Sequence, residues 1–332
     1  MATEIESLLE YTLNVGANEL ILTEGGASAV RLSGKVCAIP DAPAIPVGSL
    51  RSFLPSMDAE SGTIKGNWCG SHWRVRYYRA ALGNAAVFRP TLAECPEFSS
   101  LGAPESLSNL LGFNSGLVVF AGPPCSGKTT TATAYVSEMC KSGILRVSSL
   151  DTASEIPINF AQSLVLNDSS KDIPKKIEQA LRSGTDLMWL GDFDSSTLVP
   201  ILQAAESSTL VVITVTAGNV VGVLDALLSS VPSENRALVR GMLASVLKAV
   251  IVQRLVPSIQ GGCVAAWEIL YGTQNVASQI RNGEYFTLPS IIGASSSDGM
   301  MLMDDCLLQL ANGGYVSVED ASRAAVNPTR FG

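Results

Sequence analysis

The sequence contains a single histidine, His72, and its seven cysteines include no pair at C-x-x-C spacing. Because zinc sites and disulfide frameworks are built from clustered histidines and cysteines, neither kind of site is predicted. Charged residues make up only 16% of the chain, below the roughly 25% that is usual for soluble domains. A surface with so few charges indicates large buried interfaces between subunits.

Positive charge is also scarce: 22 Lys and Arg residues stand against 30 Asp and Glu residues, and the formal net charge is −8. Nucleic-acid affinity is built largely from clustered Lys and Arg, so a nucleic-acid translocase is disfavoured and no nucleic-acid partner is predicted. The amino terminus shows no secretory signal, and polar residues, Asp225 among them, interrupt the apolar stretch 207–231. We expect a cytoplasmic protein without a membrane span, in which this stretch forms a buried strand followed by a helix.

The chain does contain a phosphate-binding loop (P-loop) motif, G-x-x-x-x-G-K-[ST], between a strand-like run at 117–120 and a helix-like stretch at 130–141. Backbone N–H groups of such a loop converge at a helix N-terminus and bind phosphate oxygens. Lys128 then reaches the β and γ phosphates, and Thr129 offers its hydroxyl to Mg²⁺. The motif predicts a nucleoside triphosphate site made of Gly122, Pro123, Pro124, Cys125, Ser126, Gly127, Lys128, Thr129 and Thr130.

The first 90 residues or so predict a small α+β domain. One amphipathic helix is expected near the amino terminus, together with short strands at 19–23, 30–32, 73–78 and 85–89. Prolines at positions 90, 96 and 104 then mark a connecting segment. We place the domains at residues 1–97 and 98–332.

From Leu117 onward, apolar strands alternate with helical stretches, which predicts an α/β domain with a largely parallel sheet covered on both faces. A ligand of such a sheet lies at the carboxyl ends of its strands. After Pro232 the chain is expected to be mostly helical apart from one strand at 263–270. The strands expected before that point lie at 117–121, 144–150, 163–166, 187–190 and 210–215.

The strand predicted at 187–190 is followed by Gly191 and Asp192, which is the pattern of a Walker B motif. Hydrolytic P-loop enzymes use such a carboxylate to hold Mg²⁺ or to align the attacking water. Asp192 is therefore predicted to be a catalytic residue. A solvated strand end is the alternative interpretation.

Short segments along nearly the full chain resemble the PilT family of type IV pilus retraction ATPases, within the type II/IV secretion ATPase superfamily. Residues 16–23 are similar to the family's G-A-S-D-L-H-L-S, and residues 265–269 are similar to a later signature. The resemblance implies a PAS-like α+β domain followed by a RecA-like P-loop ATPase domain, assembled as a homo-hexameric ring that uses ATP and Mg²⁺. It also implies that inner-membrane pilus or secretion platform proteins are partners and that the ATPase is peripheral at the inner membrane.

The resemblance extends to further site residues. In the family, arginines of the amino-terminal domain help to complete the ATP site, and Arg74, Arg76 and Arg89 are the matching candidates. Arg74 and Arg89 are predicted to be catalytic because a guanidinium suits the charge that develops on the phosphoryl group; solvated strand residues are the alternative. The family's Asp-box acid is matched by Asp151 or by Glu155, and we favour Asp151 because a strand end is a rigid platform.

The chain also departs from the family pattern. Asp192 stands where the family has glutamate, Asp194 replaces an arginine, and Thr216 and Thr209 replace histidines. Removing one methylene draws a carboxylate back by roughly 1 Å, and a misplacement of that size can reduce the rate on the order of 100-fold. A threonine cannot carry imidazolium charge.

The segment that matches the family's retraction signature, residues 275–282, keeps Ile280 and Arg281 but lacks the signature's first arginine and final glutamate. These losses weigh against pilus retraction as the work performed, whereas the substitutions above predict a motor ATPase of reduced activity. The alternative is a ring subunit that binds ATP without hydrolysing it and serves a structural or regulatory role.

Overall fold

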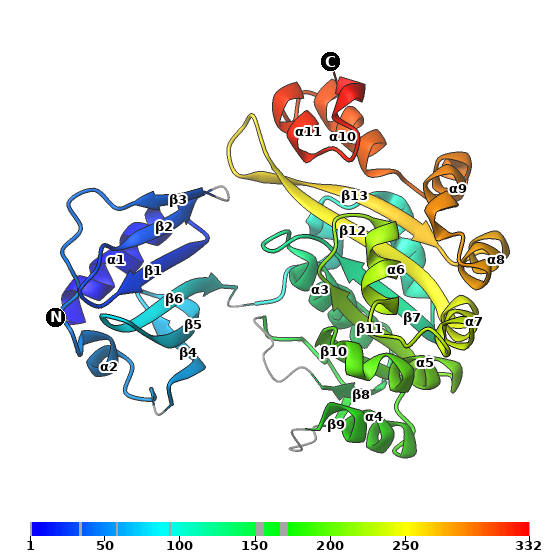
Figure 1. The fold of residues 1–332 in the computed structure, drawn as a ribbon, viewed down its shortest axis with the longest axis horizontal. Coiled ribbons are helices and arrows are strands. Elements are labelled where there is room, and N and C mark those ends of the chain that lie inside the picture. Colours follow the sequence, from blue (N-terminus) through cyan, green and yellow to red (C-terminus); the bar gives the residue numbers. More distant parts are fainter. Residues whose placement is uncertain are drawn as a thin grey trace. The chain divides into compact units, whose positions relative to one another are not determined.

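The computed structural model describes residues 2–32, 35–57, 59–92, 94–150, 156–166 and 172–331. The chain forms two compact units, which we call the amino-terminal unit (residues 1–94 and 155–157) and the P-loop unit (residues 95–154 and 158–332). Figure 1 shows the elements of each unit. The functional boundary between residues 97 and 98 stays a prediction.

The amino-terminal unit is an antiparallel sheet of six strands in the order β3-β2-β1-β6-β5-β4, with helices packed against it. Helix α1 buries Ile5, Leu8 and Leu9, so the predicted α+β organisation is confirmed. The strands are β1 (Glu19–Thr23), β2 (Ala29–Leu32), β3 (Lys35–Ala38), β4 (Ser61–Trp68), β5 (Ser71–Ala80) and β6 (Gly83–Thr91). The helices are α1 (Ala2–Asn14) and α2 (Ser49–Phe53).

Two strands of this unit, β3 and β4, were not predicted. Strand β4 contains Gly62 and Gly66, and glycine, serine and asparagine are depleted in strands, so its composition resembles a loop. Strand β3 is exposed throughout and has no apolar face toward the core. Both lie at the edges of the sheet, where side-chain burial contributes least to the sequence signal.

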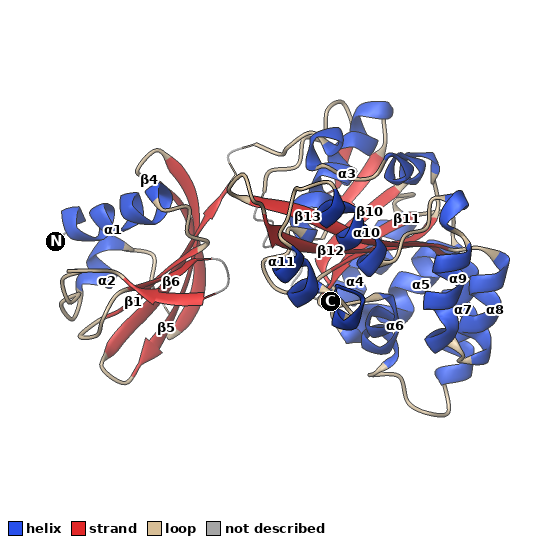
Figure 2. Ribbon diagram, turned by 90° about the horizontal axis from the view of Figure 1, so that it is seen from above, coloured by secondary structure: helices blue, strands red, loops and turns tan. Residues whose placement is uncertain are grey.

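The P-loop unit is built on a sheet of seven strands in the order β13-β12-β7-β11-β10-β8-β9. All neighbouring pairs are parallel except β12 with β13, and helices lie on both sides of the sheet (Figure 2), as predicted. The strands are β7 (Gly116–Ala121), β8 (Arg146–Ser149), β9 (Leu164–Leu166), β10 (Leu187–Asp192), β11 (Leu210–Val215), β12 (Leu247–Pro257) and β13 (Cys263–Tyr271).

The helices of the P-loop unit alternate with its strands and then dominate its carboxy-terminal part. The α-helices are α3 (Lys128–Ser142), α4 (Ile173–Arg182), α5 (Leu198–Glu206), α6 (Val220–Leu228), α7 (Arg236–Val246), α8 (Gln274–Asn282), α9 (Leu288–Ala294), α10 (Met303–Asn312) and α11 (Val318–Ala324). Short 3₁₀ helices are η1 (Phe98–Leu101), η2 (Glu105–Gly112), η3 (Ser195–Thr197), η4 (Tyr285–Thr287), η5 (Ser296–Asp298) and η6 (Pro328–Phe331).

The prediction of a mostly helical chain after Pro232 was wrong for β12. This strand is 11 residues long, pairs with β7 in parallel and with β13 in antiparallel orientation, and is almost entirely buried along Leu247–Gln253. A strand buried on both faces reads as a continuous apolar run, which periodicity cannot distinguish from a buried helix. The correction matters because β12 lies next to the strand that leads into the P-loop.

The apolar stretch 207–231 forms β11 followed by α6, as predicted. Asn219 caps this helix, because its side-chain oxygen accepts a hydrogen bond from the Gly222 N–H at 2.8 Å. Among the helices that the structure describes, none combines the length and the apolar character needed to cross a bilayer.

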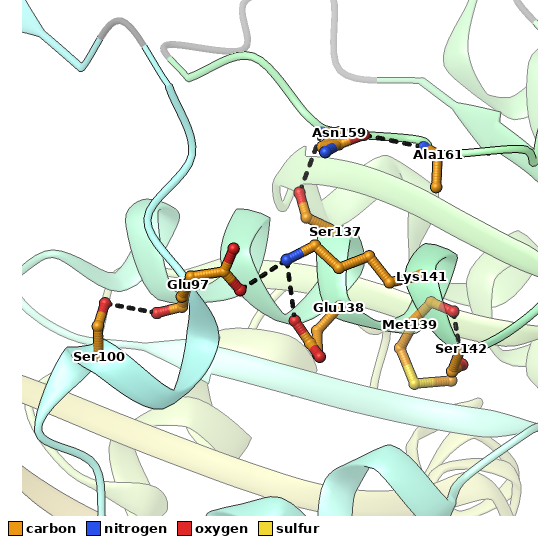
Figure 3. A network of polar contacts seen from close by, with 9 residues as sticks. All are labelled: Glu97, Ser100, Ser137, Glu138, Met139, Lys141, Ser142, Asn159 and Ala161. Atoms are coloured by element: carbon orange, nitrogen blue, oxygen red, sulfur yellow. Dashed lines mark hydrogen bonds and ion pairs between the residues drawn. The ribbon is translucent and has the colours of Figure 1, made fainter.

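Helix α3 is held at its carboxy-terminal end by the segment that leads into the P-loop unit (Figure 3). Lys141 Nζ lies 2.6 Å from Glu97 Oε2 and 3.3 Å from Glu138 Oε2. On the same helix, Ser137 Oγ accepts a hydrogen bond from the Asn159 N–H at 3.2 Å. The helix that begins at the P-loop is therefore fixed to two other segments by its last turns.

Candidate functional site

Strands β7, β10 and β11 end at one edge of the sheet, and β12 runs past the same edge. Ala121 pairs with Val252 of β12 on one side and with Val215 of β11 on the other, and Thr214 pairs with Asp192 of β10. Because neighbouring strands are about 4.8 Å apart, Asp192 lies about 10 Å across the sheet from the end of β7. The structure thus brings the P-loop and Asp192 to the carboxyl edge, where ligands of such sheets bind.

The P-loop connects β7 to α3 through a tightly packed turn. A Cβ added at Gly122 would stand 2.2 Å from Ser126 Oγ and 2.4 Å from the Gln253 carbonyl oxygen, so only glycine fits there. Gly127 precedes α3 with φ +82°, a left-handed conformation that also favours glycine. Backbone this close, leading into a helix N-terminus, gives the concave N–H arrangement that binds anions.

The backbone of the loop and of the first turn of α3 sets the positions of the motif's side chains. Lys128, Thr129 and Thr130 form the first turn of α3 and are partly exposed at its positive end. Cys125 is exposed and has φ +62°, a conformation that side-chain-bearing residues rarely adopt. Ser126 is buried, and its hydroxyl has no hydrogen-bond partner within the described part of the chain. The predicted phosphate-binding residues therefore lie together in the loop and in the first turn of α3.

Asp192 is oriented by a threonine on the neighbouring strand. Thr214 Oγ1 donates a hydrogen bond to Asp192 Oδ1 at 2.8 Å, while the carboxylate stays exposed at the strand end. Gly191 before it has φ +72°, which turns the chain at this point. Sequence reasoning missed Thr214, although a lone polar residue in the apolar run of β11 is a signal for it. The Thr129 hydroxyl and the Asp192 carboxylate are both hard oxygen donors, which suit Mg²⁺.

The residues that depart from the family pattern have distinct structural environments. Asp194 Oδ1 accepts a hydrogen bond from the Ser196 N–H at 2.8 Å, and this bond lowers the pKa of Asp194 and caps η3. Thr216 is exposed and follows β11 at the carboxyl edge. Thr209 is buried at the opposite edge and donates to the Thr185 carbonyl oxygen at 2.9 Å, so it is not near the P-loop.

The predicted Asp-box acid, Asp151, and its alternative, Glu155, lie outside the described residues. The strand that leads to Asp151 is described: the Leu150 N–H, just after β8, donates to the Trp189 carbonyl oxygen of β10 at 2.8 Å. This places the last described residue before Asp151 beside β10.

The predicted catalytic arginines lie on adjacent strands of the amino-terminal unit. Arg74 of β5 is directly opposite Arg89 of β6 in the sheet. Arg89 binds Glu19, with Nε 2.8 Å and Nη2 2.5 Å from Oε1, and Glu19 Oε2 accepts a second bond from Arg31 at 2.8 Å. Burial alone would raise the pKa of Glu19, but the two guanidinium partners lower it below its ordinary value.

Glu268 of β13 is a buried acid on the far side of β12 from the P-loop's own strand. Its Oε2 accepts a hydrogen bond from the Val220 N–H at 2.8 Å, at the start of α6. Burial raises the pKa of Glu268 to about 7, with a further increase from the charge of Asp304, although the Val220 bond and the charge of Arg254 act in the opposite direction. This group titrates near neutral pH.

The raised pKa predicts a pH-dependent stability. The pKa of Glu268 is higher in the folded chain than its ordinary value of 4.5. The protonated side chain therefore makes its full contribution to the free energy of unfolding below pH 4.5, and this contribution is lost as the pH rises through about 7. The free energy of unfolding should fall by on the order of 3 kcal/mol from this group between about pH 4 and pH 8.5. Urea unfolding of wild type and Glu268→Gln across this range measures it. An identical pH profile in the variant would contradict the assignment.

The fold and the site define a class: a RecA-like P-loop domain with a strand-end carboxylate at the same edge of a parallel sheet, joined to an amino-terminal α+β domain. Residues 86–292 match the family model described as "Type II/IV secretion system protein". The chain belongs to this family.

Three relatives make the similarity more specific. The chain is 28% identical to the type IV pilus retraction ATPase PilT of Pseudomonas aeruginosa, over 99% of this chain and 100% of the relative. It is 30% identical to a twitching motility protein of Neisseria gonorrhoeae, over 77% of this chain and 70% of the relative. The crystal structure of the pilus retraction motor PilT with bound ADP has 25% identity, a TM-score of 0.78 and 98% coverage of both chains. The predicted resemblance to the PilT family is confirmed.

Proposed function

We propose that the protein is a PilT-type motor ATPase that couples ATP hydrolysis to a pilus or secretion machine. One observation carries the proposal: a P-loop in which only glycine fits at Gly122 lies at the same sheet edge as Asp192, whose carboxylate is held by Thr214. A PilT structure with bound ADP and 25% identity to this chain supports a nucleotide as the ligand.

Each residue has a separate role in the proposed reaction. The backbone N–H groups of the P-loop and the Lys128 ammonium bind the β and γ phosphates. Thr129 and Asp192 hold Mg²⁺, which when bound neutralises charge on the phosphate oxygens. Arg74, Arg89 and Asp151 are proposed to complete the site, the arginines by stabilising charge on the transferring group and Asp151 by polarising water.

We further propose that turnover is slow. Asp192 has one methylene fewer than glutamate, so its carboxylate reaches less far from the strand end toward a phosphate. Asp194 caps a 3₁₀ turn and supplies no positive charge. These features favour one alternative: a structural or regulatory ring subunit that binds ATP and hydrolyses little or none of it.

The assembly is proposed to be a homo-hexameric ring at the inner face of the membrane that holds a pilus or secretion platform. The similarity to pilus retraction and twitching proteins supports such a partner. The net charge of −8 argues against a nucleic acid as the polymer on which the motor acts.

Calorimetry with ATP and Mg²⁺, a steady-state ATPase assay and light scattering of the purified protein together test the proposal. Heat of binding with measurable turnover in an oligomer supports the motor. Binding without turnover leaves the ring-subunit alternative. No heat with adenine nucleotides would reject both, and a strict monomer with and without ATP would reject the ring.

A further inference from the structure

Gln253 lies at the point where β12 reaches the carboxyl edge of the sheet. Its neighbour Val252 pairs with Ala121, so Gln253 stands beside the first residue of the P-loop, Gly122. The residue is 5% exposed, whereas the other polar residues of β12, Lys248 and Arg254, are only partly buried. A buried amide requires specific hydrogen bonds, so its contacts indicate what it does.

Gln253 contacts the P-loop at both of its ends. At the start, its carbonyl oxygen would stand 2.4 Å from a Cβ at Gly122. At the end, its side-chain Nε2 would stand 2.8 Å from a Cβ at Gly127, the residue that precedes α3. The two glycines of the motif, Gly122 and Gly127, are therefore the positions against which Gln253 packs.

The same side chain also binds the first turn of the helix. Thr131 Oγ1 donates a hydrogen bond to Gln253 Oε1 at 2.6 Å, and Thr131 is fully buried two residues after Thr129. The Thr131 N–H donates to the Gly127 carbonyl oxygen at 3.0 Å, which begins the helical hydrogen bonds. Gln253 thus connects the sheet to the turn that carries Lys128.

Arg254, the next residue of β12, joins the strand to two further segments. Arg254 donates through Nη2 to the Gly218 carbonyl oxygen at 2.8 Å and through Nη1 to the Ala324 carbonyl oxygen. Gly218 lies in the connection between β11 and α6, and Ala324 is the last residue of α11. Strand β12 is therefore held next to Gln253 by two segments apart from the P-loop, which makes it a rigid support for this side chain.

We propose that Gln253 is a positioning residue that holds the P-loop in its phosphate-binding shape before nucleotide arrives. It does so by joining β12 to the first turn of α3 through Thr131 while its backbone and amide cover Gly122 and Gly127. A loop held in this shape loses less conformational freedom on binding, so affinity increases. The effect on affinity rests on the proposed function, whereas the shape of the loop can be measured without nucleotide.

Cys125 provides the measurement, because it is exposed at the centre of the loop. Each cysteine is labelled with iodoacetamide in the absence of nucleotide, and its rate is followed by peptide mass spectrometry, with exposed Cys37 and Cys263 as internal references. Gln253→Ala and Thr131→Val should change the Cys125 rate by about threefold or more and weaken ATP binding about tenfold, the effect of one lost buried hydrogen bond. Thr131→Ser, which keeps the hydroxyl, should behave as wild type.

Thr185→Val is the matched control for a general loss of stability. Thr185 is buried at the opposite edge of the sheet and donates to the Ala180 carbonyl oxygen at 2.8 Å. Loss of the Thr185 hydroxyl should leave the rate of Cys125 labelling unchanged. A wild-type Cys125 rate in folded Gln253→Ala would overturn the inference, even if wild type binds ATP. A changed rate in a protein whose wild type binds no ATP would support the inference and reject the proposed function.

Discussion

Lys128→Ala is expected to weaken ATP binding about 10- to 100-fold and to bring ATP turnover below detection. The ammonium group lies in the first turn of α3, at the end of the loop where phosphate is proposed to bind. A hydrogen bond to a charged group contributes about 1.5–3 kcal/mol, which sets the range for affinity. Turnover falls further because the same charge is proposed to stabilise the transferring phosphoryl group.

Calorimetry and an ATPase assay on the same preparation measure both effects. The matched control is Lys141→Ala, which removes the same charge from the other end of the same helix (Figure 3). Lys141 is paired with Glu97 and Glu138 on the surface, and such pairs contribute little to stability. If both variants bind ATP as wild type does, the P-loop is not the nucleotide site.

Asp192→Glu is expected to increase kcat about 10- to 100-fold. The longer side chain returns the carboxylate by roughly 1 Å toward the position that the PilT family uses, and positioning errors of that size change rates by such factors. The Km for ATP should change less, because Lys128 and the loop backbone are proposed to dominate ground-state binding. Steady-state kinetics with Mg²⁺ and ATP separate the two parameters.

Two further variants make this result specific. Asp194→Glu adds the same methylene two residues away, at the cap of η3, and should not raise kcat. Thr214→Val removes the 2.8 Å hydrogen bond to Asp192 and should lower kcat in the wild-type background by releasing the carboxylate. An unchanged or reduced kcat in Asp192→Glu would mean that the reach of this carboxylate does not limit the reaction.

The sequence predicts those parts of the site that are formed by local chemistry. The P-loop is one continuous segment with a strand before it and a helix after it, so the sequence predicts both the motif and its flanking elements. Asp192 is predicted because it directly follows an apolar strand. Strand β12 was not predicted, because it lies between β7 and β13 and is buried on both faces, so it reads as a continuous apolar run with no polar face to reveal a strand.

Side-chain partnerships across the sheet were also beyond prediction. Thr214 and Gln253 act on residues of other strands, at Asp192 and at Thr131, and only the pairing register shows which residues meet. For the same reason, the sequence shows Arg89 as a candidate for the phosphate but not its bond to Glu19. Contacts set by register depend on the whole fold, whereas motifs depend on neighbours in the chain.

The carboxylate of Glu19 lies between Arg31 and Arg89, and the residue is only 4% exposed. An anion that recruits Arg89 must therefore compete with an acid that is already desolvated, and its departure would leave Glu19 with one guanidinium instead of two. If a triphosphate bound Arg89 in place of Glu19, the pKa of Glu19 would rise. Binding of Arg89 to the triphosphate would consequently depend on pH. If Arg89 acts on the phosphate as proposed, Glu19 would thus set a threshold on when this arginine becomes available.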